Sequence, residues 1–297
     1  MKTNRSERKK FKKTILAATA VIGASTLLFQ GFTQAATATE FKKTNTIPTS
    51  YSNYAAGSSQ AVPNSLPKGY QKANYKIGAI DLEYYRNQKP TSKDMPKEEA
   101  AEIGARALWE VFGLNLEGQV IEMGYEQPAE SLPRSRWYAD VLVNGKRSYS
   151  FSVDSVTGEL FDIVHGRTLD KKVSVAFDPA LDKNPQEYVA LAKKLAEKYN
   201  VVHGPIKSVA YNGQGYSDND PTISLDIKGE DGEIALMTFS RYDKALLGIG
   251  YNGSYKPSLE FSERLMKRVE EKAKELEKSA PPTNENEGSF LRVLDLD

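Results

Sequence analysis

The chain contains few residues of the types that usually perform catalysis. Its 297 residues include no cysteine and only two histidines, His165 and His203. Without cysteine there can be no thiol catalysis, thiolate zinc site, iron–sulfur cluster or disulfide. Neither histidine has a second ligand at helical spacing, and no phosphate-cradling glycine loop follows an expected strand. We therefore expect no metal and no cofactor.

Serine chemistry is a second catalytic option. Ser65 and Lys68 match the Ser-x-x-Lys element of penicillin-binding enzymes, and residues 217–219 read Ser-Asp-Asn. The third element, Lys-Thr-Gly, is missing, and no Gly-x-Ser-x-Gly elbow occurs. Short motifs of this kind recur by chance, so the sequence predicts no serine nucleophile.

Acidic residues leave one catalytic class open. Asp218 and Asp220 flank an asparagine, and residues 230–233 include three acids, but neither cluster completes a calcium-binding loop. Turn chemistry explains both clusters. Glycoside hydrolysis depends on the separation of two carboxylates in space, which the sequence does not show. A carboxylate-based cell-wall hydrolase therefore stays an alternative.

One run of residues is better suited to recognition than to catalysis. Residues 134–138 read Arg-Ser-Arg-Trp-Tyr. In a strand whose Trp137 faces the core, Tyr138 faces the other side of the sheet. Because interfaces are enriched in arginine and aromatic residues, we predict a binding face for a peptide or protein loop made of Arg136, Tyr138 and Tyr149. Core packing explains Trp137 equally well.

The elements that would position these residues occur twice. Pro96 and Pro185 each begin a helical pattern, and four segments of period-two alternation follow each helix. In the second copy, residues 184–187 read Asn-Pro-Gln-Glu, which predicts a capping box. The expected strands are 120–125, 137–143, 147–153 and 159–164 in the first copy, and 206–211, 223–228, 233–239 and 246–251 in the second.

The two copies share one register. Tyr125 and Tyr211 lie 86 residues apart, as do Asp140 and Asp226. We predict an α+β fold of two tandem helix-plus-antiparallel-sheet repeats, each α-β-β-β-β, over residues 69–168 and 169–257. They are expected to pack together or to join edges into a longer sheet. Hairpin turns are expected at residues 144–145 and 230–232.

Further elements flank the two copies. Residues 75–85 are apolar enough for one more strand, and residues 258–279 predict a C-terminal helix with a narrow apolar stripe. This helix either covers part of the sheet or binds a partner. Residues 39–68 predict a disordered spacer, and residues 280–297 a flexible tail. The last eight residues alternate enough to dock as a short strand on a sheet edge instead.

The first residues of the chain predict its destination. Residues 1–38 combine seven basic residues with a long uncharged stretch that ends in small residues, which is typical of a secretory signal peptide. An uncleaved membrane anchor is the alternative. Without this segment 33 basic and 38 acidic residues remain, near −5, so nucleic-acid binding is not expected. We expect a secreted protein that does not contact the membrane after cleavage and that associates with the cell wall.

Residues 152–160 read Ser-Val-Asp-Ser-Val-Thr-Gly-Glu-Leu. This segment resembles the closing turn of the PepSY domain family. The resemblance covers residues 96–165, with helix, tyrosine-containing strand and turn in order. The second copy has residues 240–245 in this place, without a Thr-Gly pair. We assign Asp154, Thr157 and Gly158 a structural role, because Asp154 can accept hydrogen bonds from the following amides and Gly158 can adopt positive φ.

The resemblance implies an extracytoplasmic module, often in tandem, that restrains peptidases or supports cell-wall enzymes, including those of spore germination. We therefore expect a non-catalytic binding module that inhibits, localises or stabilises an extracytoplasmic peptidase or cell-wall hydrolase. It would act by steric blocking or by strand addition at a sheet edge. A structural component of the cell envelope or spore coat is the second alternative.

Overall fold

The computed structural model describes residues 66–279. The strands are β1 (Lys76–Ala79), β2 (Val120–Glu126), β3 (Arg136–Val143), β4 (Lys146–Asp154), β5 (Leu160–His165), β6 (Ile206–Ser217), β7 (Asp220–Gly229), β8 (Ile234–Ser240) and β9 (Leu246–Gly250). The helices are α2 (Glu83–Arg86), α3 (Lys97–Phe112), α4 (Pro179–Lys183), α5 (Gln186–Lys198) and α6 (Asn252–Ser279). The predicted signal peptide, most of the spacer and the predicted tail lie outside the described residues.

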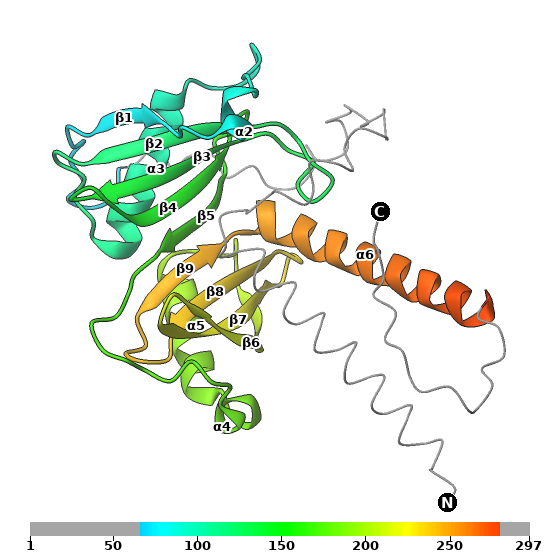
Figure 1. Ribbon diagram of the computed structural model, residues 1–297. Helices are drawn as coiled ribbons and strands as arrows, with labels where there is room; N and C mark the ends of the chain where they lie inside the picture. Colours follow the sequence, from blue (N-terminus) through cyan, green and yellow to red (C-terminus); the bar gives the residue numbers. More distant parts are fainter. Residues whose placement is uncertain (1–65, 280–297) are drawn as a thin grey trace, which may run out of the picture.

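One nine-stranded sheet runs through the described residues, in the order β1-β2-β3-β4-β5-β9-β8-β7-β6. Only β1 and β2 pair in parallel, and all other neighbours are antiparallel. Four consecutive antiparallel strands follow α3, and four follow α5; the two groups join where β5 pairs with β9 (Figure 1). The fold is thus α+β, with one large sheet and a C-terminal helix.

The two long helices that precede the strand groups pack on the core face of the sheet. Helix α3 approaches closely because Gly104 lies against Phe151, where a Cβ atom would come within 2.2 Å of the ring. Helix α5 places Tyr188 against Phe239, with ring centroids 6.3 Å apart. Both phenylalanines are fully buried. A single cluster of buried apolar residues extends from the first strand group into the second.

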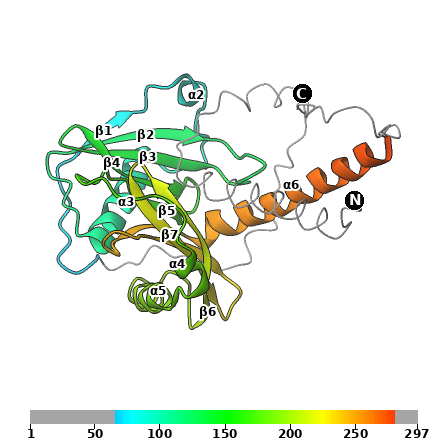
Figure 2. The ribbon, with the colours of Figure 1, turned by 60° about the horizontal axis from the view of Figure 1, so that its bottom comes forward.

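Helices α2 and α6 lie on the opposite face. Gly124 in β2 lies under the ring of Tyr85 in α2, and Tyr255 in α6 donates a hydrogen bond from its hydroxyl to Asp226 Oδ1 of β7 at 2.7 Å. Asp226 is flanked in β7 by two core residues, so its side chain points away from the core. Beyond these contacts α6 extends away from the sheet (Figure 2).

The helix starts differ from the sequence prediction in two places. Helix α6 begins at Asn252 rather than at residue 258, although Pro257 lies inside it, because Tyr251 accepts hydrogen bonds from the amides of Ser254 and Tyr255. The predicted capping box is wrong. Asn184 ends the short helix α4 instead, and α5 begins without a side-chain cap.

Two other segments also differ from the sequence prediction. The expected strands 206–211 and 223–228 leave residues 212–222 outside any strand, but β6 and β7 continue through them as a hairpin that turns at Asp218, whose φ is 51°. Asn219 stabilises this turn because its side chain bonds the backbone amide and carbonyl of Leu169, at 2.7 and 2.8 Å. The strand expected within residues 75–85 ends at Ala79 and is followed by α2.

Candidate binding surface

Arg136 and Tyr138 project from β3 on the face that α3 leaves uncovered. Arg136 Nη2 lies 2.6 Å from Glu126 Oε2, and the Tyr138 hydroxyl donates to Asp140 Oδ1 at 2.9 Å. The ring of Tyr85 stacks on Tyr138 with an interplanar angle of 8°, and its hydroxyl donates to Glu126 Oε1 at 2.9 Å. These side chains therefore bind one another, and the face that we predicted for a partner is largely occupied by intramolecular contacts.

Burial sets the electrostatics of this network. Burial raises the pKa of both Tyr85 and Tyr138, so each hydroxyl stays a donor. Burial opposes the charge of Arg136, but the nearby acids Glu126 and Asp162, with Tyr85, together outweigh it and raise the guanidinium pKa. Asp162 on β5 lies beside this pair and accepts a hydrogen bond from Ser152; its burial raises its carboxyl pKa despite the nearby guanidinium. The network can neutralise and orient these groups, but it does not present a free charge.

Tyr149 lies on the other face of the sheet. It is paired in register with Val141, a fully buried core residue, and cross-strand partners share a face. Its ring stacks on the ring of His165, with centroids 4.3 Å apart, and its centroid lies 5.5 Å from that of Phe112 in α3. The prediction that Tyr149 and Tyr138 form one exposed surface is therefore wrong.

The turn after β4 has the predicted structure. Asp154 Oδ1 accepts hydrogen bonds from the amides of Val156 and Thr157, at 2.8 and 2.6 Å, and Gly158 has a φ of 77°. Asp154 and Gly158 thus have the hydrogen bonds and the backbone conformation of a closing turn. Thr157 also accepts a side-chain hydrogen bond at 3.0 Å from Arg134.

Arg134 connects the start of β3 to this turn. Its Nε lies 2.6 Å from Asp154 Oδ2, and its Nη1 lies 2.5 Å from Glu159 Oε2. Its guanidinium carbon also lies 4.8 Å from the ring centroid of Phe161. The sequence placed Arg134 in the aromatic and basic run, and only the fold shows that it binds the turn.

The corresponding turn of the second strand group has the same backbone hydrogen bonds without the Thr-Gly pair. The Gly158 amide donates to the Asp154 carbonyl at 3.0 Å, and 86 residues later the Lys244 amide donates to the Ser240 carbonyl at 3.0 Å. The Ser240 amide in turn donates to the carbonyl of Ala245 at 2.9 Å. Lys244 has a φ of 63°, so a lysine adopts the conformation of the glycine.

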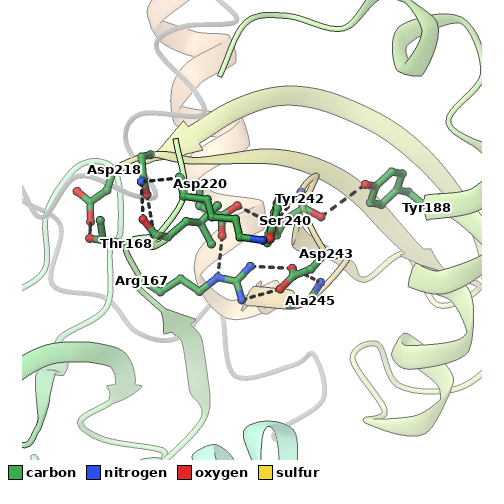
Figure 3. A network of polar contacts seen from close by, with 12 residues as sticks. Arg167, Thr168, Tyr188, Asp218, Asp220, Ser240, Tyr242, Asp243 and Ala245 are labelled. Carbon is green, nitrogen blue, oxygen red and sulfur yellow. Dashed lines mark hydrogen bonds and ion pairs between the residues drawn. The ribbon is translucent and has the colours of Figure 1, made fainter. Parts of the chain in front are cut away.

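A polar network fixes this second turn to the segment that connects the two strand groups (Figure 3). Arg167 donates from Nε to Asp220 Oδ2 at 2.7 Å and from its two terminal nitrogens to Asp243 at 2.9 and 2.7 Å. Ser240 Oγ donates to Asp220 Oδ1 at 2.6 Å. The hydrogen bonds from Arg167 lower the pKa of Asp243 to about 2.

An exposed apolar surface lies beside this network. We call it the Arg241 patch and define it by four residues, whose exposed fractions are 38% for Val175, 59% for Phe177, 64% for Tyr216 and 45% for Tyr242. The Arg241 amide donates to the carbonyl of Pro221, the register partner of Tyr216. The patch thus combines the tip of the β6–β7 hairpin, the turn after β8 and the segment before α4.

Arg241 holds these three segments together. Its Nη2 donates to the carbonyl of Ala176 at 2.9 Å, and its Nη1 donates to Gln214 Oε1 at 2.8 Å. Gln214 Oε1 also accepts the amide of Asp178 at 3.0 Å. The hydrogen bonds of Arg241 and Gln214 therefore hold in place the backbone that bears these exposed side chains.

The sequence could not identify this patch. Val175 and Phe177 lie in a segment without periodicity, and Tyr216 lies between the expected strands 206–211 and 223–228. The remaining sequence candidates are dispersed: His203 Nδ1 lies 2.8 Å from Glu233 Oε1, while His165 stacks on Tyr149. Within residues 66–279, no three His, Cys, Asp or Glu residues gather closely enough to hold a metal ion. The same residues include no helix that is long and apolar enough to cross a membrane.

No family model and no curated protein matches the chain. A solved structure that resembles it is the C-terminal domain of Bacillus megaterium YpeB, with a TM-score of 0.33 and 12% sequence identity. The alignment covers 54% of this chain and 65% of that chain, just under two thirds of it. At this TM-score the likeness assigns neither a fold family nor a function.

Proposed function

We propose that the protein is a secreted, non-catalytic binding module that inhibits, localises or stabilises an extracytoplasmic peptidase or cell-wall hydrolase. In this proposal each strand group with its helix is one PepSY-like repeat. The repeated order of elements supports this assignment, as do the matching hydrogen bonds of the turns at Gly158 and Lys244, 86 residues apart. The single observation that carries the binding role is the Arg241 patch.

The patch has the composition and the rigidity of a protein-binding surface. Aromatic residues are enriched in the centres of interfaces, and grouped exposed apolar side chains on a soluble protein mark interaction sites. The nearby charges are already paired: Asp243 binds Arg167, and Lys244 binds Glu187. The patch therefore favours an apolar loop of a partner over a strongly charged one. Because Arg241 fixes the backbone beneath, binding would cost little ordering entropy.

The experiment is affinity capture from the host's culture fluid and envelope, with residues 39–297 as bait and mass spectrometry as the readout. We expect one peptidase or wall hydrolase to be retained at moderate salt. The double variant Tyr216→Ser, Tyr242→Ser should lose it. Leu82→Ser is the control, because Leu82 is similarly exposed but lies immediately before α2, outside the Arg241 patch. An inhibition assay on the captured enzyme then tests regulation.

Two results would contradict this function. Recovery of the bait alone, with concentration-dependent self-association, would favour a structural envelope or coat component. Hydrolysis of wall polymer by the purified protein, abolished when one of its carboxylates is replaced, would favour the carboxylate hydrolase. Capture that is unchanged in the double variant would leave a binding role but exclude the Arg241 patch as its site.

A further inference from the structure

The longest strand of the sheet lies at one of its edges. Strand β6 has 12 residues, lies at the end of the strand order and pairs with β7 on one side. On its other side, no strand among residues 66–279 pairs with it. An open edge of this length presents unpaired amides and carbonyls to any extended segment that can reach it.

Apolar side chains mark the part of this edge that is suited to another strand. Ile206, Val209 and Tyr211 contact the core but are only partly buried. Register shifts occur between Ile206 and Ser208 and between Tyr211 and Gly213, so residues 208–211 form the regular stretch between two bulges. A strand added here would pair with that stretch and cover the partly exposed side chains.

The chain itself contains a segment of suitable composition. The described residues end at Ser279 in α6, and 18 residues follow in the sequence. The last eight, residues 290–297, read Phe-Leu-Arg-Val-Leu-Asp-Leu-Asp. In an extended conformation one face carries Phe290, Leu294 and Leu296 together with Arg292. The three apolar side chains of this face would lie against those of the edge.

Charge complementarity favours the same placement. A shallow hollow of about 510 Å³ adjoins β6, and its lining includes the exposed side chains of Lys207 and Lys228. Glu233 also lines it, but this carboxylate is buried and bound to His203. The segment's acids, Asp295 and Asp297, stand near its end. Their pairing with these lysines would add to the main-chain hydrogen bonds and would weaken with salt.

The position of α6 allows residues 290–297 to reach β6. Its base lies beside β6, because Asn212 Nδ2 donates to the Tyr255 hydroxyl at 3.1 Å. From Tyr255 to Ser279 the helix spans about 36 Å at about 1.5 Å per residue. From Ser279 to Phe290, across residues 280–289, eleven residue steps reach about 36–40 Å when the chain is extended. It can therefore bring the last eight residues back to the sheet.

We propose that residues 290–297 of this chain add as a tenth strand to the outer edge of β6, next to residues 208–211. The segment would close the open edge and cover it until a competing strand displaces it. This contact is intramolecular and needs no partner, so it stands or fails independently of the proposed function.

Disulfide scanning tests the proposal directly, because the protein has no cysteine of its own. Ala210→Cys on β6 is combined with single cysteines at each position from 290 to 297, in residues 39–297, under mild oxidation. We expect cross-linked monomer at alternate positions, since neighbouring side chains on one face of a sheet recur every second residue. Lys76→Cys on β1, at the opposite end of the sheet, is the matched control and should cross-link poorly throughout.

Amide hydrogen exchange provides a second readout. Deleting residues 280–297 should remove protection from residues 208–211 and leave the amides of β8 unchanged. Asp295→Asn with Asp297→Asn should produce part of the same loss. Uniformly weak cross-linking without alternation, or exchange at residues 208–211 that the deletion does not change, would overturn the proposal. Cross-linked dimers in place of monomers would overturn it in favour of a second copy of the chain.

Discussion

Two arginines perform the same task for the two turns that follow β4 and β8. Arg134 binds Asp154, which is 2% exposed, and Arg167 binds Asp220, which is fully buried. Each carboxylate is shielded from water, so the guanidinium that pairs with it must compensate for the hydration that the carboxylate loses on folding. The two pairs differ in origin, since Arg134 precedes β3 of its own group while Arg167 comes from the connecting segment.

Replacing Arg134 therefore leaves a buried carboxylate without its partner. We expect Arg134→Ala to lower the free energy of unfolding by about 3 kcal/mol, the usual cost of breaking a buried pair. Urea denaturation measures this loss. Arg86→Ala is the control, because the Arg86–Asp81 pair is exposed on both sides and should contribute little. Equal effects of the two substitutions would show that burial does not determine the strength of the Arg134 contacts.

The pKa of Asp243 leads to a prediction about acid stability. Because Arg167 lowers this pKa from 3.8 to about 2, the folded protein binds the proton less readily than the unfolded chain. The contribution of the ionised carboxylate is thus present above about pH 4 and is lost as the pH falls toward 2. Asp243→Asn should have a lower melting temperature than the parent at pH 7, and the difference should shrink by pH 2. A difference in melting temperature that stays constant from pH 7 to pH 2 would contradict this dependence of stability on the ionisation of Asp243.

At the scale of elements, the two closing turns place different residues in one backbone conformation. Gly158 adopts positive φ without cost, whereas Lys244 adopts it against the contact between its Cβ and the backbone. Lys244→Gly should therefore raise the urea midpoint, because the exposed contact that it loses with Glu187 is weak. Gly158→Ala should lower the free energy of unfolding by about 1–2 kcal/mol. A destabilising Lys244→Gly would show that the Glu187 contact outweighs the backbone strain.

Periodicity predicted the elements well, and it failed where local sequence does not determine the structure. The helices α3 and α5 and the strands β2 to β5, β8 and β9 lie close to their expected ranges, and the hairpin expected at Asn144 and Gly145 has positive φ at both residues. The β6–β7 hairpin was missed because its tip contains glycines and polar residues, and Asn219 stabilises it through a distant segment.

The candidate surface was predicted less well than the fold, for a related reason. Tyr149 was assigned to the wrong face because its partner in β3 is Val141, and alternation within one strand does not reveal which residue of the next strand lies opposite. The Arg241 patch was missed because Phe177 and Tyr242 are far apart in sequence and become neighbours only through the contacts of Arg241 with residues 176 and 214.

At the scale of the whole molecule, the two strand groups share one sheet and one core. Ile163 of β5 pairs with Ile249 of β9, both are buried, and the same cluster of apolar residues includes both groups. Exposing the core of either group would also expose apolar surface of the other. The groups should therefore unfold together rather than as two independent domains.

This cooperativity can be measured because both tryptophans belong to the first strand group and its helix, Trp109 to α3 and Trp137 to β3. Tryptophan fluorescence follows that group alone, and hydrogen exchange of the buried amides of β7 and β8 follows the second. We expect one urea midpoint for both probes. Ile249→Ala, which removes buried methyl groups at the junction, should lower both midpoints equally, by a free energy of about 2–5 kcal/mol. A second group that unfolds at its own midpoint, or that alone responds to Ile249→Ala, would show that three paired residues at β5 and β9 do not couple the two halves.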